Sequence, residues 1–164
     1  MGDSCRFSQS HGIVPMEVPL ADSYNAGVTF ESVNMAKYNH LTMIMLGSDS
    51  VAGAGVLTIY GGATDGAQTA AITFGYRYGA ADAKSASADV FGAVATSAAL
   101  TLTEASVKSG TLVVELDAAD LNISGVQYQW VTPVLSAAGT AGIVSAVAIL
   151  SEPRYEEAVM DTAI

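Results

Sequence analysis

The sequence predicts an all-β protein built as an antiparallel double-sheet sandwich. From residue 28 onward, short apolar runs alternate with breaks of Gly, Ala, Ser and Asp, which is the spacing of consecutive strands and turns. Several runs alternate apolar and polar residues with a period of two, and the 3.6-residue apolar stripe of a helix is missing. Eight or nine strands within residues 28–155 are enough for two packed sheets, and the topology we expect is a jelly roll.

Residues 1–27 are expected to form an extended N-terminal arm. They are polar, contain Pro15 and Pro19, and follow neither strand nor helix periodicity. Proline fixes φ and pushes the preceding residue toward extended conformations. Because terminal segments without pairing partners are generally mobile, we expect this arm to become ordered only against a neighbouring subunit.

Residues 28–155 are expected to form a single β domain, since neither a linker nor an internal repeat divides them. The predicted strands cover residues 28–32, 41–46, 56–60, 71–78, 89–95, 100–103, 111–117, 127–135 and 143–150. Period-two alternation predicts that one face of three of these strands lies in the core. The residues on that face are Ile72, Phe74, Tyr76 and Tyr78, then Leu112, Val114 and Leu116, and finally Val126, Tyr128 and Trp130.

Residues 156–164 are expected to be a C-terminal tail, in which a short helix beginning near Tyr155 is compatible with the composition. The stretch 121–150 carries no charge and is long enough to span a membrane. Polar residues, Gly and Pro interrupt it, so two strands joined by a small-residue turn explain it better. The N-terminus lacks the apolar core of a signal peptide, and we expect cytoplasmic synthesis and no membrane partner.

The charge balance argues against nucleic-acid binding and for an assembly. The chain has 16 acidic and 6 basic residues, and the basic residues are scattered singly. Phosphate neutralisation needs clusters of Lys and Arg, so we expect no direct contact with nucleic acid. Charged residues make up 13% of the chain, about half the usual ~25%. We therefore expect a subunit whose surface is partly covered by neighbouring proteins.

The sequence offers few groups for catalysis, and no catalytic residue is assigned. Cys5 is the single cysteine, which excludes an intrachain disulfide. Cys5 and His11 both lie in the expected arm, where nothing would hold a nucleophile against a base. His40 is expected to be a partly exposed residue near the edge of a strand. The chain contains neither a Gly-x-Ser-x-Gly elbow nor a Gly-rich phosphate loop that precedes a Lys, and we expect no enzyme.

The carboxylates are isolated, so no metal site and no cofactor are expected. Calcium needs 6–8 oxygen ligands from several positions. Asp65–Gly66 is explained by a turn, since both residue types tolerate the backbone angles of turns. Asp117 is followed three residues later by Asp120, which is expected to cap or turn the chain after its strand.

The remaining candidates for binding are apolar. Tyr76, Tyr78, Tyr128 and Trp130 alternate with polar residues, which suits a core face as well as a sugar-binding groove, and we favour the core. Three methionines are expected to fill gaps in the core or in an interface; they are Met35, Met43 and Met45.

Several segments resemble a group of small virion proteins of tailed phages. Residues 32–45 contain Val-x-Met-x-x-Tyr-x-His-Leu-Thr leading into a strand, and residues 57–77 contain a strand, an Ala-Thr-Asp-Gly turn and a second strand. Residues 110–121 form a strand pattern that ends in an acidic Asp-Ala-x-x-Leu turn, and residues 148–155 end on Arg-Tyr. The resemblance implies a jelly-roll-like domain carried on the virion and brings no catalytic residues.

These observations together predict a non-enzymatic virion structural protein. We expect a capsid decoration or cement subunit on the capsid exterior, which binds the major capsid protein, bridges neighbouring subunits and forms a homo-oligomer, with a trimer favoured. The alternative is a tail or baseplate module that recognises a host-surface glycan. An exposed aromatic groove would favour the glycan module, whereas a broad, polar and acidic outer face would favour the cement protein.

Overall fold

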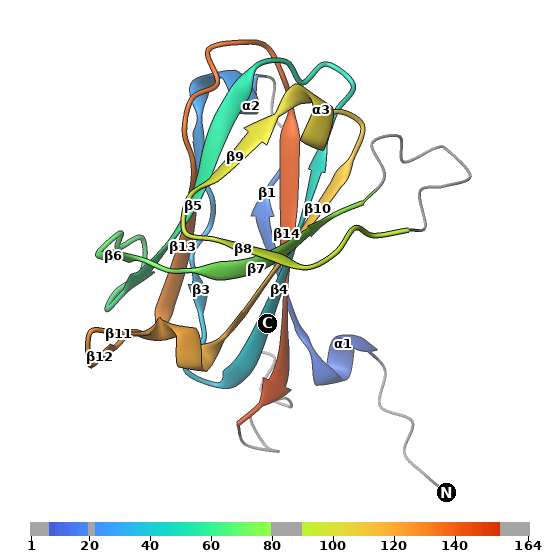
Figure 1. The fold of residues 1–164 in the computed structure, drawn as a ribbon. Coiled ribbons are helices and arrows are strands. Elements are labelled where there is room, and N and C mark those ends of the chain that lie inside the picture. Colours follow the sequence, from blue (N-terminus) through green and yellow to red (C-terminus); the bar gives the residue numbers. More distant parts are fainter. Residues whose placement is uncertain (1–6, 20–21, 80–89, 155–164) are drawn as a thin grey trace, which may run out of the picture.

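The structure is a computed structural model that describes residues 7–19, 22–79 and 90–154. Its strands form two antiparallel sheets that pack face to face. In Figure 1, β5, β13 and β3 lie to the left, and β1, β14, β4 and β10 lie to the right. The predicted antiparallel β-sandwich is confirmed.

Sheet A is the larger continuous sheet, with the strand order β1-β14-β4-β10-β7-β8. Every neighbouring pair is antiparallel. The strands are β1 (Gly12–Glu17), β14 (Val144–Pro153), β4 (Tyr38–Gly47), β10 (Thr111–Asp117), β7 (Phe74–Tyr78) and β8 (Ala95–Ser97).

Sheet B has β13 and β5 at its centre, flanked by pairs of short strands. On one side β13 pairs with β2 and β3, and on the other side β5 pairs with β6 and β9. The strands are β2 (Val28–Thr29), β3 (Val33–Asn34), β13 (Trp130–Leu135), β5 (Ala54–Gly62), β6 (Ala70–Ala71) and β9 (Leu100–Thr103).

Short elements connect the sheets. A separate hairpin precedes β13, and a 3-10 turn precedes that hairpin. The elements are α1 (Phe7–Ser10), α2 (Ser23–Ala26), α3 (Glu104–Val107), η1 (Ala118–Leu121), β11 (Asn122–Ile123) and β12 (Val126–Gln127). Within the described ranges, no helix is both long and apolar enough to cross a bilayer.

The uncharged stretch 121–150 holds the short hairpin β11–β12 and two longer strands, β13 and β14. The two strands predicted there correspond to β13 and β14, but these belong to different sheets. β13 lies in sheet B and β14 in sheet A, so the small-residue connection between them crosses the sandwich and does not close a hairpin. The strands predicted at 100–103 and 111–117 have the same bounds in the structure, as β9 and β10. The strand predicted at 89–95 is wrong over residues 90–94, because β8 begins at Ala95.

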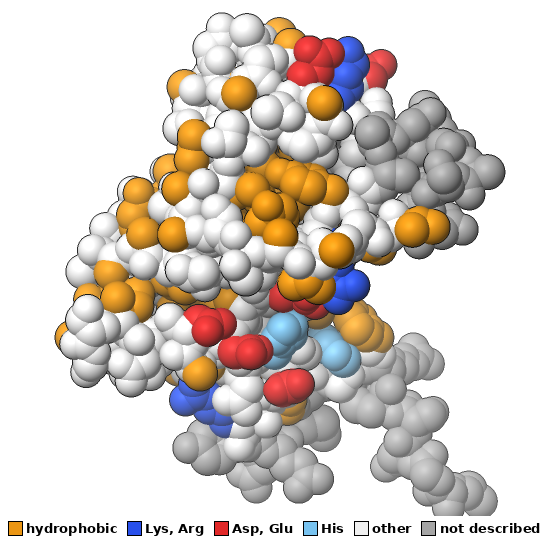
Figure 2. Space-filling model, viewed as in Figure 1, with side chains coloured by type: hydrophobic (Ala, Val, Ile, Leu, Met, Phe, Trp, Pro, Cys, Tyr) orange, Lys and Arg blue, Asp and Glu red, His pale blue; other side chains and the backbone are white. Residues whose placement is uncertain are grey.

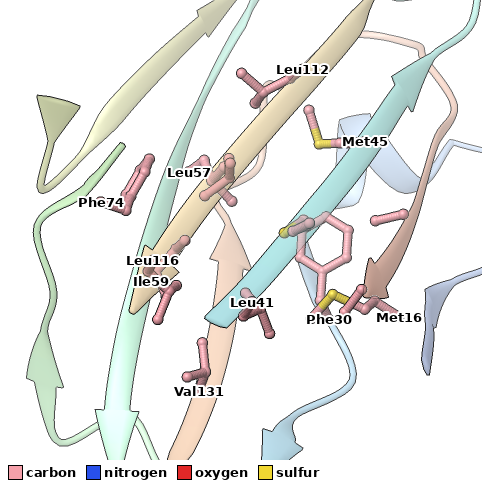
Figure 3. Packing of buried hydrophobic residues seen from close by; sticks show 14 of the residues in the cluster. Met16, Phe30, Leu41, Met45, Leu57, Ile59, Phe74, Leu112, Leu116 and Val131 are labelled. Carbon is pink, nitrogen blue, oxygen red and sulfur yellow. The ribbon is translucent and has the colours of Figure 1, made fainter. Parts of the chain in front are cut away.

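The core lies between the sheets, and both sheets contribute alternate side chains to it (Figure 3). From sheet A, Leu41, Leu112 and Leu116 point inward, and from sheet B, Leu57 and Val131 meet them. The predicted inward face of 111–117 is confirmed, since its three apolar residues are at most 2% exposed. The three methionines are also confirmed as core residues; they are Met35, Met43 and Met45.

The prediction that residues 1–27 form an arm outside the domain is wrong for residues 12–17 and 22–27. Residues 12–17 are β1, which pairs along its length with β14 of the same chain. Ser23 exchanges two hydrogen bonds with the backbone of Val144, at 3.2 and 2.9 Å, and Tyr24 is fully buried. Sequence periodicity missed these residues because Pro15 and a β-bulge interrupt the alternation. Residues 1–6, 20–21 and the expected tail from 155 onward lie outside the described residues.

The predicted inward face of 126–130 is wrong for Val126 and Trp130, whereas Tyr128 packs against the core as predicted. Val126 is 50% exposed on the β11–β12 hairpin, and Trp130 is partly exposed. In β13 the odd-numbered positions point into the core instead, with Val131 and Leu135 buried. Both parities of this strand carry apolar residues, so the alternation alone does not say which face is buried.

Candidate functional site

Two titratable side chains that are far apart in sequence meet on the outer face of sheet A. His40 lies on β4 and Asp117 ends β10, and the register of these strands makes the two residues direct cross-strand partners. Nδ1 of His40 is 2.6 Å from Oδ1 of Asp117, and the two side chains are 25% and 65% exposed. The prediction of a partly exposed His40 is confirmed, although it lies on a central strand.

Ser151 of β14 occupies the same cross-strand row as His40 and Asp117. Such a row places the residue types of a Ser-His-Asp triad side by side. A working nucleophile also needs a hydrogen bond to its base and donors aimed at the oxyanion. Among the hydrogen bonds of the described residues, His40 bonds to Asp117 and none joins it to Ser151. The row is therefore a polar contact on an open sheet face.

The acidic residues at the end of β10 stabilise the turn that follows the strand. A carboxylate oxygen of Asp120 accepts a hydrogen bond of 2.8 Å from the backbone N–H of Asp117, which satisfies a backbone donor at the start of η1. The predicted turning role of Asp120 is confirmed. Across residues 7–19, 22–79 and 90–154, no three His, Cys, Asp or Glu side chains converge as metal ligands would.

His11, the second histidine, packs against residues that are close to it in the sequence. The ring of His11 stacks on the ring of Phe7 with centroids 4.1 Å apart, and its Nδ1 lies 2.8 Å from Oγ of Ser10. The imidazole is thus packed at the end of α1. Cys5 lies outside the described residues.

The aromatic ladder of β7 belongs to the core, as predicted. Phe74 is 1% exposed, and Tyr76 and Tyr78 pack against the core. Successive rings meet edge to face, at 6.5 Å between Phe74 and Tyr76 and at 5.5 Å between Tyr76 and Tyr78. Burial raises the pKa of the Tyr78 hydroxyl. These rings do not form an exposed sugar platform.

The outer face of sheet A is hollowed near the end of β4 and the start of β14. Ile44 and Leu46 of β4 and Ser145 and Val147 of β14 line a shallow hollow of about 130 Å³. Sites for drug-sized ligands enclose about 300–1,000 Å³. The hollow is therefore a dimple in an apolar surface and is too small for such a ligand.

This hollow lies within a continuous apolar surface on the four strands β1, β14, β4 and β10. The strand registers align its residues in cross-strand rows, and one row runs from Pro15 through Val147 and Ile44 to Val113. We call this surface the sheet A patch; its members are Ile13, Pro15, Ile44, Leu46, Val113, Val147 and Ile149. Ile13 and Leu46 are each 49% exposed.

Charged side chains lie at the borders of the patch, toward β7 and at the partly exposed Glu17 that ends β1. Glu115 of β10 lies 3.9 Å from Arg77 of β7 across the sheet, with about a third or more of each side chain exposed. Exposed pairs of this kind add little stability. The seven patch residues themselves carry no charge, although the chain has a net charge of −10.

A second apolar area faces the viewer in Figure 2. Hydrophobic side chains gather there in the middle of the molecule, between β9 and the β7–β8 pair, and histidine and carboxylate side chains gather below them. Exposed apolar residues also precede β8, with Val90 at 70% and Val94 at 59%.

Comparisons with known proteins identify no family. No protein-family model matches the chain, and no curated protein matches it. Among solved structures it is similar to the SPBc2 prophage-derived protein YomS, with a TM-score of 0.49 and 10% identity over 85% of this chain and 92% of that one. It is also similar to VP2 from a subviral particle of infectious bursal disease virus, with a TM-score of 0.26 and 15% identity. That match covers 90% of this chain and 42% of VP2.

These structural similarities are too weak to indicate a function. The function is therefore inferred from the surfaces of the chain itself. Sequence reasoning did not single out the sheet A patch. A signal was present in residues 41–46 and 143–150, where apolar residues occupy both parities of the strand. A strand with two apolar faces is covered on both sides, and the core covers only one side of β4 and β14.

Proposed function

We propose that this protein is a virion structural protein, a capsid decoration or cement subunit on the exterior of a tailed-phage capsid. In this role it contacts the major capsid protein and bridges neighbouring capsid subunits. The observation that carries the proposal is the sheet A patch, a charge-free apolar surface on the outer face of a chain that is otherwise strongly acidic. Contiguous exposed apolar surface commonly marks a contact with another protein.

The fold supports the same role. The chain passes between the two sheets at most of its connections; the connections β2–β3, β5–β6 and β7–β8 stay within one sheet. Sheet A places β1, β14, β4 and β10 side by side, and sheet B places β13 and β5 side by side with the short strands β2, β3, β6 and β9 at their flanks. We propose that this order is that of a jelly roll, an architecture used by viral capsid domains.

The proposed role requires no bond making or breaking. Attachment at junctions between capsid subunits, as a homo-oligomer with a trimer favoured, would let several weak contacts act together. Linked contacts raise the effective concentration of the next one, so the complex is held far more tightly than by any single contact. A protein that binds the assembled shell and not its separated subunits stabilises the shell by mass action.

Heating virions with and without this protein tests the proposal. Particles that lack it should release DNA at a lower temperature, and adding the purified protein should restore the release temperature. Identical release temperatures at saturating occupancy would reject the cement role.

One observation favours the alternative role in glycan binding. Trp130 lies outside the buried core, with Asn34 and Gly62 as its cross-strand neighbours on sheet B. Ala67 covers Gly62, so the open side of the partly exposed indole faces Asn34, and an indole beside an amide can stack on a sugar ring. If Trp130→Ala keeps the melting temperature and abolishes binding to a host glycan, a tail or baseplate location replaces the capsid location.

A further inference from the structure

We infer that the sheet A patch is the surface that docks on the capsid, and that its partner is an apolar, uncharged protein surface bordered by Lys or Arg. This inference rests on the proposed function and names the face and the chemistry of the contact. A second copy of this chain is the competing occupant of the patch.

The two sheets differ in how much of their outer face the chain itself covers. Over sheet B, the turn around Gly66 folds back so that the Gly66 N–H donates to Oγ of Ser32, at 3.0 Å. Ser32 in turn lies 2.9 Å from Oγ1 of Thr132, which is 0% exposed although it points away from the core face of β13. Sheet B thus seals part of its outer face with its own polar groups. On sheet A, Leu46 and Ile13 remain half exposed.

Charge argues against a second copy as the occupant. At the β7 end of the patch, the carboxylates of Glu115 and Asp117 outnumber the single guanidinium of Arg77. A partner with bases at the corresponding border gains attraction where a second copy meets repulsion.

The size of the patch also argues against a second copy of this chain as its occupant. Neighbouring strands are ~4.8 Å apart, and successive residues rise ~3.4 Å along a strand. The four strands of the patch, over the outward positions from Thr42 to Leu46, therefore cover roughly 20 by 20 Å when their side chains are included. That footprint is on the order of 400 Å², about half the ~800 Å² per partner of a stable complex. One patch is too small to hold an isolated dimer together. On a repetitive shell, several patches bind at once and their effects multiply.

Leu46→Lys provides the test, with Val126→Lys as its matched control. Leu46 is 49% exposed within the patch, whereas Val126 is 50% exposed on the β11–β12 hairpin, so both variants place an ammonium at an equally exposed apolar position. The binding of each protein to empty capsids purified from particles that lack this chain is measured by co-sedimentation. We expect Leu46→Lys to raise the apparent Kd at least tenfold, since a large apolar side chain of the interface is replaced by a charge. We expect Val126→Lys to leave the apparent Kd within twofold.

The binding and sedimentation results distinguish the possible occupants of the patch. If the wild-type protein binds and Leu46→Lys binds equally well, the patch is not the docking face, and the cement role stands without it. If the wild-type protein does not bind capsids at all, the proposed function fails and this inference fails with it. If sedimentation shows wild-type dimers at micromolar concentration that Leu46→Lys abolishes, the occupant is a second copy. Ile13→Lys on the edge strand β1 replaces Leu46→Lys should the latter fail to fold, and the same results apply.

Discussion

Removing the hydroxyl of Tyr24 should destabilise the protein strongly, because this group completes the hydrogen bonding of two buried strands. Tyr24 is 0% exposed. Its hydroxyl donates to the carbonyl of Leu102 at 2.6 Å and accepts from the N–H of Gly55 at 3.2 Å, and these two residues are direct partners in the β9–β5 pair. Tyr24→Phe keeps the ring and leaves both backbone groups without this partner.

The expected cost follows from those two groups. A buried donor or acceptor that loses its partner costs about 1–3 kcal/mol, so the free energy of unfolding should fall by about 3 kcal/mol. For a chain of this size, that corresponds to a melting temperature lower by about 6–12 °C. Thermal and urea unfolding followed by circular dichroism measure the change. Tyr60→Phe on the outer face of sheet B is the control, which should stay within ~0.5 kcal/mol.

The same hydroxyl predicts a pH dependence. Burial raises the pKa of Tyr24 above its ordinary value of 10.0. The folded state therefore keeps the phenol protonated where the unfolded chain ionises, so the stability that this group contributes is complete below pH 10 and is lost as the pH rises beyond it. Between pH 9 and pH 11, the wild-type protein should lose more stability than Tyr24→Phe. A melting temperature unchanged by Tyr24→Phe would show that the Tyr24 hydroxyl does not anchor the residues before β2. An equal loss of stability at alkaline pH in both proteins would show the same.

Three further changes have definite expected outcomes. Gly47→Ala should lower the melting temperature sharply because a methyl group there collides with the backbone carbonyl of Val107, whereas Gly75→Ala, whose methyl would meet only ordinary contacts, should be tolerated. Leu112→Ala removes a side chain that is 1% exposed and should cost about 2–5 kcal/mol of unfolding free energy in urea titrations. His40→Ala should leave the restoration of particle heat resistance intact, and a loss of restoration in a folded His40→Ala protein would point to a role in contact or chemistry that the proposal lacks.

Deleting residues 2–19 should destabilise the folded domain. An arm that lies outside the domain could be removed without loss of folding. The structure places β1 beside β14 with Met16 buried at 3% exposure, so the deletion opens an edge of sheet A and should lower the melting temperature. Deleting residues 2–6 alone leaves β1 in place and separates the two effects.

The sequence by itself determined the fold class, several strands and the local turns. The strands β9 and β10, the inward face of β10 and the Asp65–Gly66 turn follow from alternation and from backbone preferences within a few residues. Gly66 has a φ of 72° and the Ala67 N–H bonds to the Thr64 carbonyl at 3.2 Å, as such a turn requires. These features depend on neighbours in the chain, which the sequence shows directly.

Only the tertiary structure decided which strands pair, and therefore what each face meets. His40 and Asp117 are 77 positions apart and touch because β4 and β10 are adjacent in one register. Trp130 faces outward because Val131, on the opposite parity of the same strand, lies against sheet A. The sheet A patch exists because four strands from distant parts of the chain align their outward residues. A period of two defines two faces for each strand, and only the packing of one sheet on the other determines which face is buried.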